Sequence, residues 1–167
     1  MARGQLRQWI GSILCIVGTL ASLNWAWASF TEPRFDREAE AGEHPLVGDV
    51  DAEPLSLSVQ AGGELVASEL RLGKDCRGYM AKASTNVRVY FEQPEDASIE
   101  ITLESEHRNA LIVNGTDGEW HCVRSSSDHK SVLNLEAPNK GQLDIWAANF
   151  SEGRLDPATL TVRPVLP

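Results

Sequence analysis

Hydrophobic and polar residues alternate along much of the chain in short runs separated by turn residues. The clearest run extends from Ile99 to Leu103, where every second residue is apolar. Successive side chains of a strand face opposite sides of a sheet, so this pattern predicts a strand with one buried face. Turn residues such as Gly62-Gly63 and Pro138-Asn139 separate the runs. The runs that predict strands are 55–59, 87–91, 99–103, 111–113, 119–123, 132–135, 143–148 and 159–163.

The predicted strands indicate an all-β domain. They recur roughly every 8–12 residues, and apolar residues nowhere keep a period of 3.6 over three helical turns. A region of about 120 residues is large enough for one core. These observations predict a single antiparallel β-sandwich. The core is expected to contain the inward-facing apolar residues of the strands, namely Leu57, Val59, Val87, Val89, Phe91, Ile99, Ile101, Leu103, Leu111, Val113, Leu133, Leu135, Leu143, Ile145, Leu160 and Val162.

The first 28 residues have the pattern of a secretory signal peptide. Arg3 and Arg7 precede an apolar stretch, and Ala26-Trp27-Ala28 matches the small residues that flank a cleavage site. The stretch of about 15 apolar residues is shorter than the roughly 20 that a membrane-spanning helix needs, and an uncleaved anchor is the alternative. We therefore predict a signal peptide over 1–28, no membrane span after its cleavage, and a periplasmic or secreted location.

Residues 29–45 are predicted to form a flexible acidic tether, because charged and small residues alternate there without a sustained apolar period. A short helix over 36–41 would be marginal by itself. The β-sandwich domain is then expected over 46–167.

Charge excludes one class of partner. Loss of Arg3 and Arg7 with the signal peptide would change the net charge from −9 to −11. A chain this acidic repels phosphate backbones, and we expect no cluster of Lys and Arg to provide a local exception. We therefore expect no nucleic-acid partner.

Cysteine use agrees with export. Cys15 lies in the predicted signal peptide, which leaves Cys76 and Cys122. An even pair in an oxidising compartment predicts a disulfide between them. The alternatives are two free thiols or a metal-binding pair, although the Cys-x-x-Cys spacing of a zinc site is missing.

Two groups of residues have the composition of catalytic or metal sites. Ser125, Ser126 and Ser127 are near His121 and His129 in the sequence, with Asp128 adjacent, and these are the residue types of a serine-hydrolase triad. No Gly-x-Ser-x-Gly motif accompanies them, so we interpret the segment as a polar loop. The histidines, including His107, lack the spacing of metal ligands, and no metal site is predicted.

Two tryptophans carry the expectations about contacts. Trp120 and Cys122 share one strand face, so Trp120 is expected to point inward and pack on the disulfide. Trp146 lies between Ile145 and Ala147, so alternation places its indole on the face opposite the core. An exposed indole there would be a contact point for a partner protein or a sugar ring. Coverage by the N-terminal tether is the alternative.

Three sequence elements follow one another in a fixed order. They are Cys-x-Gly-Tyr at 76–79, Asp-Gly-x-Trp-x-Cys at 117–122 and Asp-Ile-Trp at 144–146. Together they resemble the bacterial pre-peptidase C-terminal domain family, in the form of small exported stand-alone proteins, over residues 46–164. The resemblance implies a jelly-roll-like sandwich without catalytic residues of its own.

Some members of that family bind calcium through acidic residues that follow the Trp-x-Cys element. In this chain Cys122 is followed by Val123 and Arg124, and a guanidinium opposes a divalent cation. Asp117 and Asp128 remain nearby, but two carboxylates are few for an ion that takes six to eight oxygens. We expect no cofactor, and whether these two residues bind calcium stays open.

These observations predict an exported, non-catalytic binding or structural module that docks on an envelope or secreted protein. The first alternative is a glycan-binding module, with Trp146 as the contact. The second is a secreted peptidase, as the naming of the resembled family suggests. The sequence does not identify the partner protein or surface glycan, nor the oligomeric state.

Overall fold

The computed structural model describes residues 32–47, 53–92, 97–136 and 138–165. The predicted signal peptide over 1–28 lies outside these residues. The strands are β1 Glu43–Val47, β2 Leu55–Gly62, β3 Leu65–Val66, β4 Tyr79–Met80, β5 Val87–Glu92, β6 Ser98–Ser105, β7 Asn109–Asn114, β8 Trp120–Arg124, β9 Lys130–Leu135, β10 Gly141–Asn149 and β11 Leu155–Val165. One 3₁₀ turn, η1 Ala67–Glu69, follows β3.

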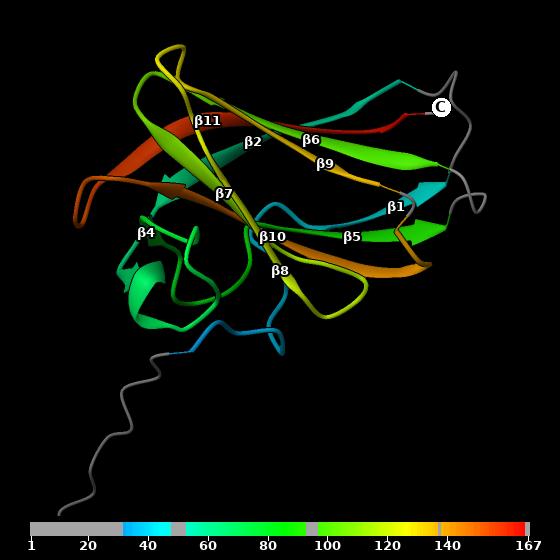
Figure 1. Cartoon of the computed structure of the whole chain (residues 1–167), viewed down its shortest axis with the longest axis horizontal. Coiled ribbons are helices and arrows are strands. Elements are labelled where there is room, and N and C mark those ends of the chain that lie inside the picture. Colours follow the sequence, from blue (N-terminus) through cyan, green and yellow to red (C-terminus); the bar gives the residue numbers. More distant parts are fainter. Residues whose placement is uncertain (1–31, 48–52, 93–96, 137, 166–167) are drawn as a thin grey trace, which may run out of the picture.

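Two sheets pack face to face, which confirms the predicted all-β sandwich (Figure 1). One sheet has four strands in the order β2-β11-β6-β9, and all its pairs are antiparallel. The other has seven strands, in which β10 pairs with β5, β4 and β7. Its edge differs from the prediction of a purely antiparallel fold, because β1 pairs with β5 in parallel.

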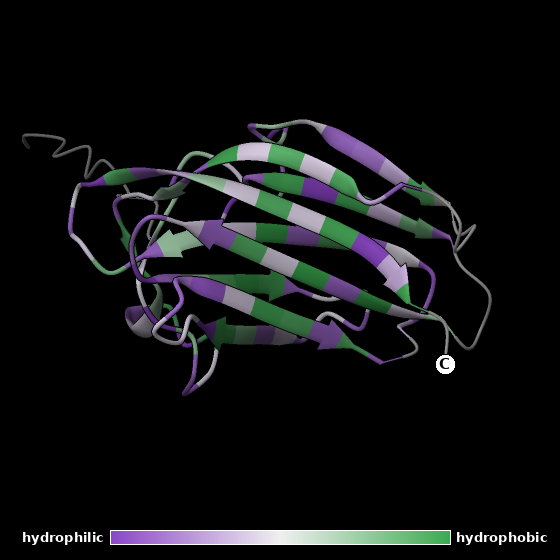
Figure 2. Ribbon diagram, turned by 90° about the horizontal axis from the view of Figure 1, so that it is seen from above, coloured by the Kyte–Doolittle hydropathy of each residue, from purple (hydrophilic) through white to green (hydrophobic). Residues whose placement is uncertain are grey.

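Alternation of apolar and polar residues produces the core between the sheets. Figure 2 shows this alternation as bands along the strands of the four-stranded sheet. All the residues predicted for the core lie in one cluster, where Leu57 and Leu133 are partly buried and the others buried. The cluster also contains residues that the prediction did not include, namely Leu46, Ala61, Ala97, Ala147 and Ala158. The predicted core is therefore confirmed and somewhat extended.

A second apolar cluster lies on the outer face of the seven-stranded sheet. Its buried members are Leu65, Ala67, Met80, Ala81, Ala110, Ile112, Trp146 and Ala148. The segment from β3 to β4 covers part of this face, and residues 32–42, which we call the N-terminal strap, cover another part. The central strands β7 and β10 are thus buried on both faces, as their uninterrupted apolar runs require.

The flexible tether predicted over 29–45 is wrong for its described part. The backbone N–H groups of Glu40 and Ala41 donate to the carbonyls of Thr85 and Asn86, at 3.0 and 2.8 Å. Residues 43–47 form β1, so the domain begins before residue 46. The segment has few apolar residues, and it is ordered by sheet hydrogen bonds and ion pairs, which hydrophobic periodicity does not reveal. Within the described residues, no helix has the length and apolar character that crossing a bilayer requires.

Candidate binding site

The indole of Trp146 is completely buried, with 0% of its surface exposed. Its Nε1 donates to the carbonyl of Ser84 at 3.1 Å. The ring of Phe35 packs edge-on against it at 5.6 Å between centroids, and Trp120 packs at 5.4 Å. Trp146 does face away from the core as predicted, but the prediction of an exposed partner contact is wrong, because the strap covers this face.

The predicted disulfide between Cys76 and Cys122 is present. Trp120 and Cys122 share one face of β8, as alternation requires, but this is the outer face of the sheet and not the core between the sheets. The prediction of an inward Trp120 is therefore corrected. The disulfide fastens the loop before β4 to β8, and so closes the apolar layer over Trp146.

A buried arginine fastens the strap to the sheet. Nε of Arg88 lies 2.8 Å from Oδ1 of Asp144, and one terminal nitrogen lies 2.7 Å from Oε1 of Glu43. The other terminal nitrogen donates to the carbonyl of Phe35 at 2.7 Å. Burial lowers the pKa of Arg88, but its bonds to Asp144 and Glu43 outweigh this and raise it overall. The guanidinium thus stays charged and holds Phe35 over Trp146.

A hollow of about 1140 Å³ lies beside the strap. It is lined by the strap, by the turn between β2 and β3, by residues 81–84 and by Leu155 at the start of β11. The charged residues of the lining are Arg34, Asp36, Arg37, Glu38, Glu40, Glu64 and Lys82. Leu155 is 57% exposed, more than any other large hydrophobic side chain among the described residues. The sequence pattern did not mark Leu155 as a site residue, because single exposed leucines are common on protein surfaces.

Hydrogen bonds hold two carboxylates of the strap, those of Asp36 and Glu40. The guanidinium of Arg34 donates two hydrogen bonds to Asp36, at 2.6 and 2.7 Å, and lowers the pKa of that carboxyl to about 2. Burial raises the pKa of Glu40, although the amide of Asn86, at 2.8 Å, opposes the shift. The hollow therefore presents both signs of charge, and hydrogen bonds hold Arg34, Asp36 and Glu40 in place.

Gly62 and Gly63 form the turn that borders the hollow. Both have positive φ, +118° and +152°. A Cβ at Gly62 would collide with the carbonyl of Arg154, and one at Gly63 would collide with the backbone of Met80. Only glycine allows the turn to approach both neighbours so closely, so these residues set the shape of this side of the hollow.

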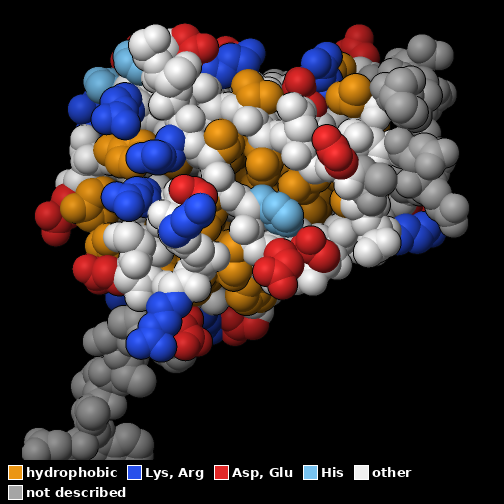
Figure 3. All heavy atoms as spheres, viewed as in Figure 1, with side chains coloured by type: hydrophobic (Ala, Val, Ile, Leu, Met, Phe, Trp, Pro, Cys, Tyr) orange, Lys and Arg blue, Asp and Glu red, His pale blue; other side chains and the backbone are white. Residues whose placement is uncertain are grey.

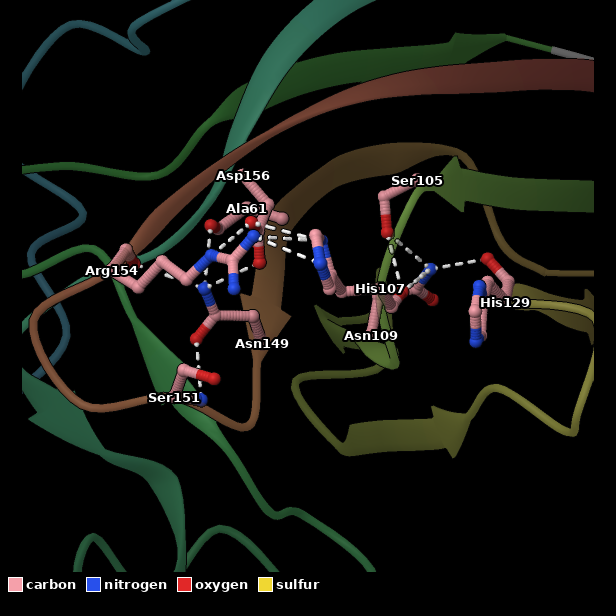
Figure 4. A network of polar contacts seen from close by, with 9 residues as sticks. All are labelled: Ala61, Ser105, His107, Asn109, His129, Asn149, Ser151, Arg154 and Asp156. Atoms are coloured by element: carbon pink, nitrogen blue, oxygen red, sulfur yellow. Dashed lines mark hydrogen bonds and ion pairs between the residues drawn. The ribbon is translucent and has the colours of Figure 1, made fainter.

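A polar network next to the hollow ties the turn between β10 and β11, which joins the two sheets, to neighbouring loops (Figure 4). The buried carboxylate of Asp156 pairs with Arg154 at 2.6 Å, lies 3.3 Å from the ring of His107, and accepts from Asn149 at 3.1 Å. The hydroxyl of Ser105 donates to the backbone carbonyl of His107 and not to its ring. Among the described residues, the ring of His107 therefore contacts Asp156 and Arg154 and no hydroxyl group, and the network holds the turn between β10 and β11 in place.

The serine cluster does not assemble the geometry of a hydrolase. Oγ of Ser125 is buried and accepts from the backbone N–H of Asn109 at 3.0 Å, and Ser126 bonds to Asp128. Among the described residues, neither ring of His121 and His129 forms a hydrogen bond to one of these serines. His121 faces Asp117, at 3.4 Å, and Ser125, Ser126 and Ser127 lie in the connection between β8 and β9.

The acidic residues considered for calcium lie on two different turns. Asp117 precedes β8 and Asp128 follows it, so the length of the strand separates them. A hydrogen bond from the N–H of Glu119 lowers the pKa of Asp117, and a hydrogen bond from Ser126 lowers that of Asp128. In the part of the chain that the structure describes, no three His, Cys, Asp or Glu side chains gather as a metal site would require.

The chain is similar to several solved structures, among them the two that follow. No family model matches the chain, and no curated protein matches it. It is similar to the pre-peptidase C-terminal domain of a collagenase from Bacillus anthracis, with a TM-score of 0.44 and 10% identity, over 77% of this chain and 99% of that one. It is also similar to the periplasmic inhibitor of g-type lysozyme from Aeromonas hydrophila, with a TM-score of 0.45 and 11% identity, over 74% and 96%.

The first of these structures is a domain of the family that the sequence elements resemble. At these identities and TM-scores the two likenesses carry no argument about the surfaces of this chain. They therefore leave the candidate site to be judged on its own geometry.

Proposed function

We propose that this chain is an exported, non-catalytic module that docks on a cell-envelope protein or a secreted protein. The observation that carries the proposal is the exposure of Leu155 in the hollow beside the strap, whose lining also contains charged side chains of both signs. Protein interfaces commonly combine an apolar anchor with a polar and charged rim. A partner that buries Leu155 would also meet charges of both signs, which favours specific docking over general adhesion.

The rigidity of the surroundings supports docking through this surface. Arg88 fixes one end of the strap, and Gly62-Gly63 shape the opposite wall. A surface that is already ordered loses less conformational entropy when a partner binds. The hollow is therefore suited to recognition without rearrangement.

Export is proposed from the pattern of residues 1–28 and from the disulfide. A disulfide between Cys76 and Cys122 belongs to an oxidising compartment such as the periplasm or the medium. Intact-mass measurement of the protein recovered from its host is expected to give a chain that begins at Ser29. Recovery of the uncleaved chain from the membrane fraction would contradict this part of the proposal.

The docking surface is tested by comparative capture from envelope and culture medium. The oxidised protein and its Leu155→Asp variant serve as baits, with Val132→Asp as the control, because Val132 is also exposed on a strand but outside the hollow. One partner is expected to bind the native protein and the Val132 variant, and to be lost at least tenfold with the Leu155 variant. Equal capture by all three baits, or equal loss from both variants, would contradict docking at the hollow.

A further inference from the structure

The basic residues without an ion pair in the described part of the chain are unevenly distributed. Apart from Arg37, they gather around the disulfide, and we call them the basic patch: Arg71, Lys74, Arg77, Arg108 and Arg124. All five are exposed. The remaining described Lys and Arg side chains pair with carboxylates, as Lys130 does with Glu104 at 2.7 Å. A chain with a net charge of −9 thus keeps a set of uncompensated cations in one region.

The disulfide brings the members of the basic patch together. Lys74 and Arg77 lie on the loop that contains Cys76, and Cys76 is bonded to Cys122. Arg124 shares the face of β8 with Cys122, and its register partner on β7 is Ala110, two residues beyond Arg108. In the view of Figure 3, Lys and Arg side chains gather on the left of the molecule, in the region where Figure 1 shows β4. A covalent link and sheet pairing therefore hold together the segments that carry the cations.

A hollow of about 410 Å³ lies within the patch. It is lined by Asp75, Arg108, Cys122, Val123, Arg124 and Ser125. Asp75 is the one carboxylate of this lining. The net charge of Asp75 together with the five cations is therefore still positive. Arg108 also stacks over the ring of Phe150, at 5.0 Å from its centroid, which limits the positions of its guanidinium.

We propose that the basic patch binds an acidic segment of a partner protein, that is, a loop or tail with several Asp or Glu side chains. Four of the five cations are arginines, and a guanidinium binds a carboxylate through two parallel hydrogen bonds. The disulfide and the pairing of β7 with β8 keep the segments that carry these cations together before binding, so no backbone rearrangement is needed to assemble the patch. The surface differs from the hollow at Leu155, and the inference stands independently of the function proposed above.

The size of the patch and the charge around it favour a narrow ligand. The rest of the surface carries the excess of acidic residues. An anionic membrane or a DNA duplex presents charge over a wide area, and would meet those acidic residues as well as the patch. A peptide segment touches the patch alone, so it gains the attraction without most of the repulsion.

The patch corrects one expectation drawn from the sequence. Its members occupy 71–77, 108 and 124, so no run of basic residues marks it in the chain. Only the register of β7 with β8 and the disulfide place the three segments side by side. The expectation of no local cationic cluster is therefore wrong, although the excess of acidic residues still opposes nucleic acid.

The test uses the oxidised protein and fluorescein-labelled hexaglutamate, with binding read by fluorescence anisotropy. The patch variant is Arg77→Glu with Arg124→Glu. The control is Lys140→Glu with Arg163→Glu, which makes the same change of net charge at two exposed cations elsewhere. The patch variant is expected to bind at least tenfold more weakly, and the control less than about twofold. Binding of the native protein should weaken as salt shortens the range of the attraction.

A second pair of variants and a second probe keep the outcome clear. The double variant Arg77→Gln, Arg124→Gln removes the two charges without adding repulsion, so its loss of affinity for hexaglutamate should be intermediate. Thermal melting verifies that each variant is folded. Vesicles of phosphatidylglycerol and phosphatidylcholine are tested in parallel. No binding of hexaglutamate, or equal weakening by patch and control variants, would overturn the proposal. Patch-dependent binding to the vesicles in preference to hexaglutamate would also overturn it, in favour of a membrane surface.

Discussion

Arg88 on β5 and Asp144 on β10 occupy directly paired positions of the seven-stranded sheet and form a buried ion pair, 2.8 Å from Nε to Oδ1. The register partner of Arg88 on its other side is Glu43 of β1, at 2.7 Å. One guanidinium thus connects three neighbouring strands. It explains how a polar N-terminal segment joins the sheet in parallel, where little apolar surface is available to hold it.

Replacement of Arg88 by Met is expected to destabilise the fold by about 3–5 kcal/mol, because Asp144 would remain buried without its partner. The double variant Arg88→Met, Asp144→Leu should recover much of that loss, since it leaves no buried charge at this position. Unfolding in urea measures both free energies. A loss below about 1 kcal/mol in the single variant would show that solvent reaches Asp144.

Loss of the disulfide is expected to lower the free energy of unfolding by up to about 4 kcal/mol, because the bond closes a loop between positions 46 residues apart. The double variant Cys76→Ser, Cys122→Ser is compared with the native protein in oxidising and reducing buffer. Reducing agent should lower the melting temperature of the native protein to that of the variant, and leave the variant unchanged. Identical melting of both proteins in oxidising buffer would contradict a stabilising role.

The strap is expected to control the solvent exposure of Trp146. In a Trp120→Phe background, Trp146 is the one indole outside the predicted signal peptide. Phe35→Ala removes the ring that packs edge-on against it, so the emission should shift to longer wavelength and quenching by acrylamide should increase. The lost aromatic contact should also cost about 1 kcal/mol. The control is Val132→Ala, an exposed residue of β9. Unchanged quenching in the Phe35 variant would show that other residues suffice to cover the indole.

Sequence alternation predicted the sandwich because many of its strands have one apolar face, which points toward the core, and one polar face. The run from Ile99 to Leu103 is buried on its apolar positions as expected. The outer layer escaped prediction for a different reason. Its cover comes from β3, η1, β4 and the strap, which are too short or too polar to show periodicity. The run from Ile145 to Ala148 did indicate an outer layer, since a strand that is apolar on both faces must be covered on both.

The candidate surfaces could be predicted less well than the fold. Leu155, Arg34 and Lys82 line one hollow although they are far apart in the chain. Alternation assigned Trp146 to the correct face of its strand, but whether that face was open depended on the position of Phe35. Local patterns thus showed which side chains share a face of a strand, while the packing of distant segments determined which of them remain accessible, and Trp120 was assigned to the wrong side of its sheet.

The ion pair between Arg34 and Asp36 is expected to make the strap sensitive to acid. In the folded protein the pKa of Asp36 is about 2, below its ordinary value of 3.8, so between these values the folded state binds fewer protons than the unfolded chain. This stabilisation is present above about pH 4 and is lost as the pH falls through about 2. Melting of the native protein and of Asp36→Asn should therefore differ at neutral pH and converge in acid. Glu38→Gln controls for net charge in the same segment, and a difference that persisted unchanged to about pH 2 would contradict the pairing.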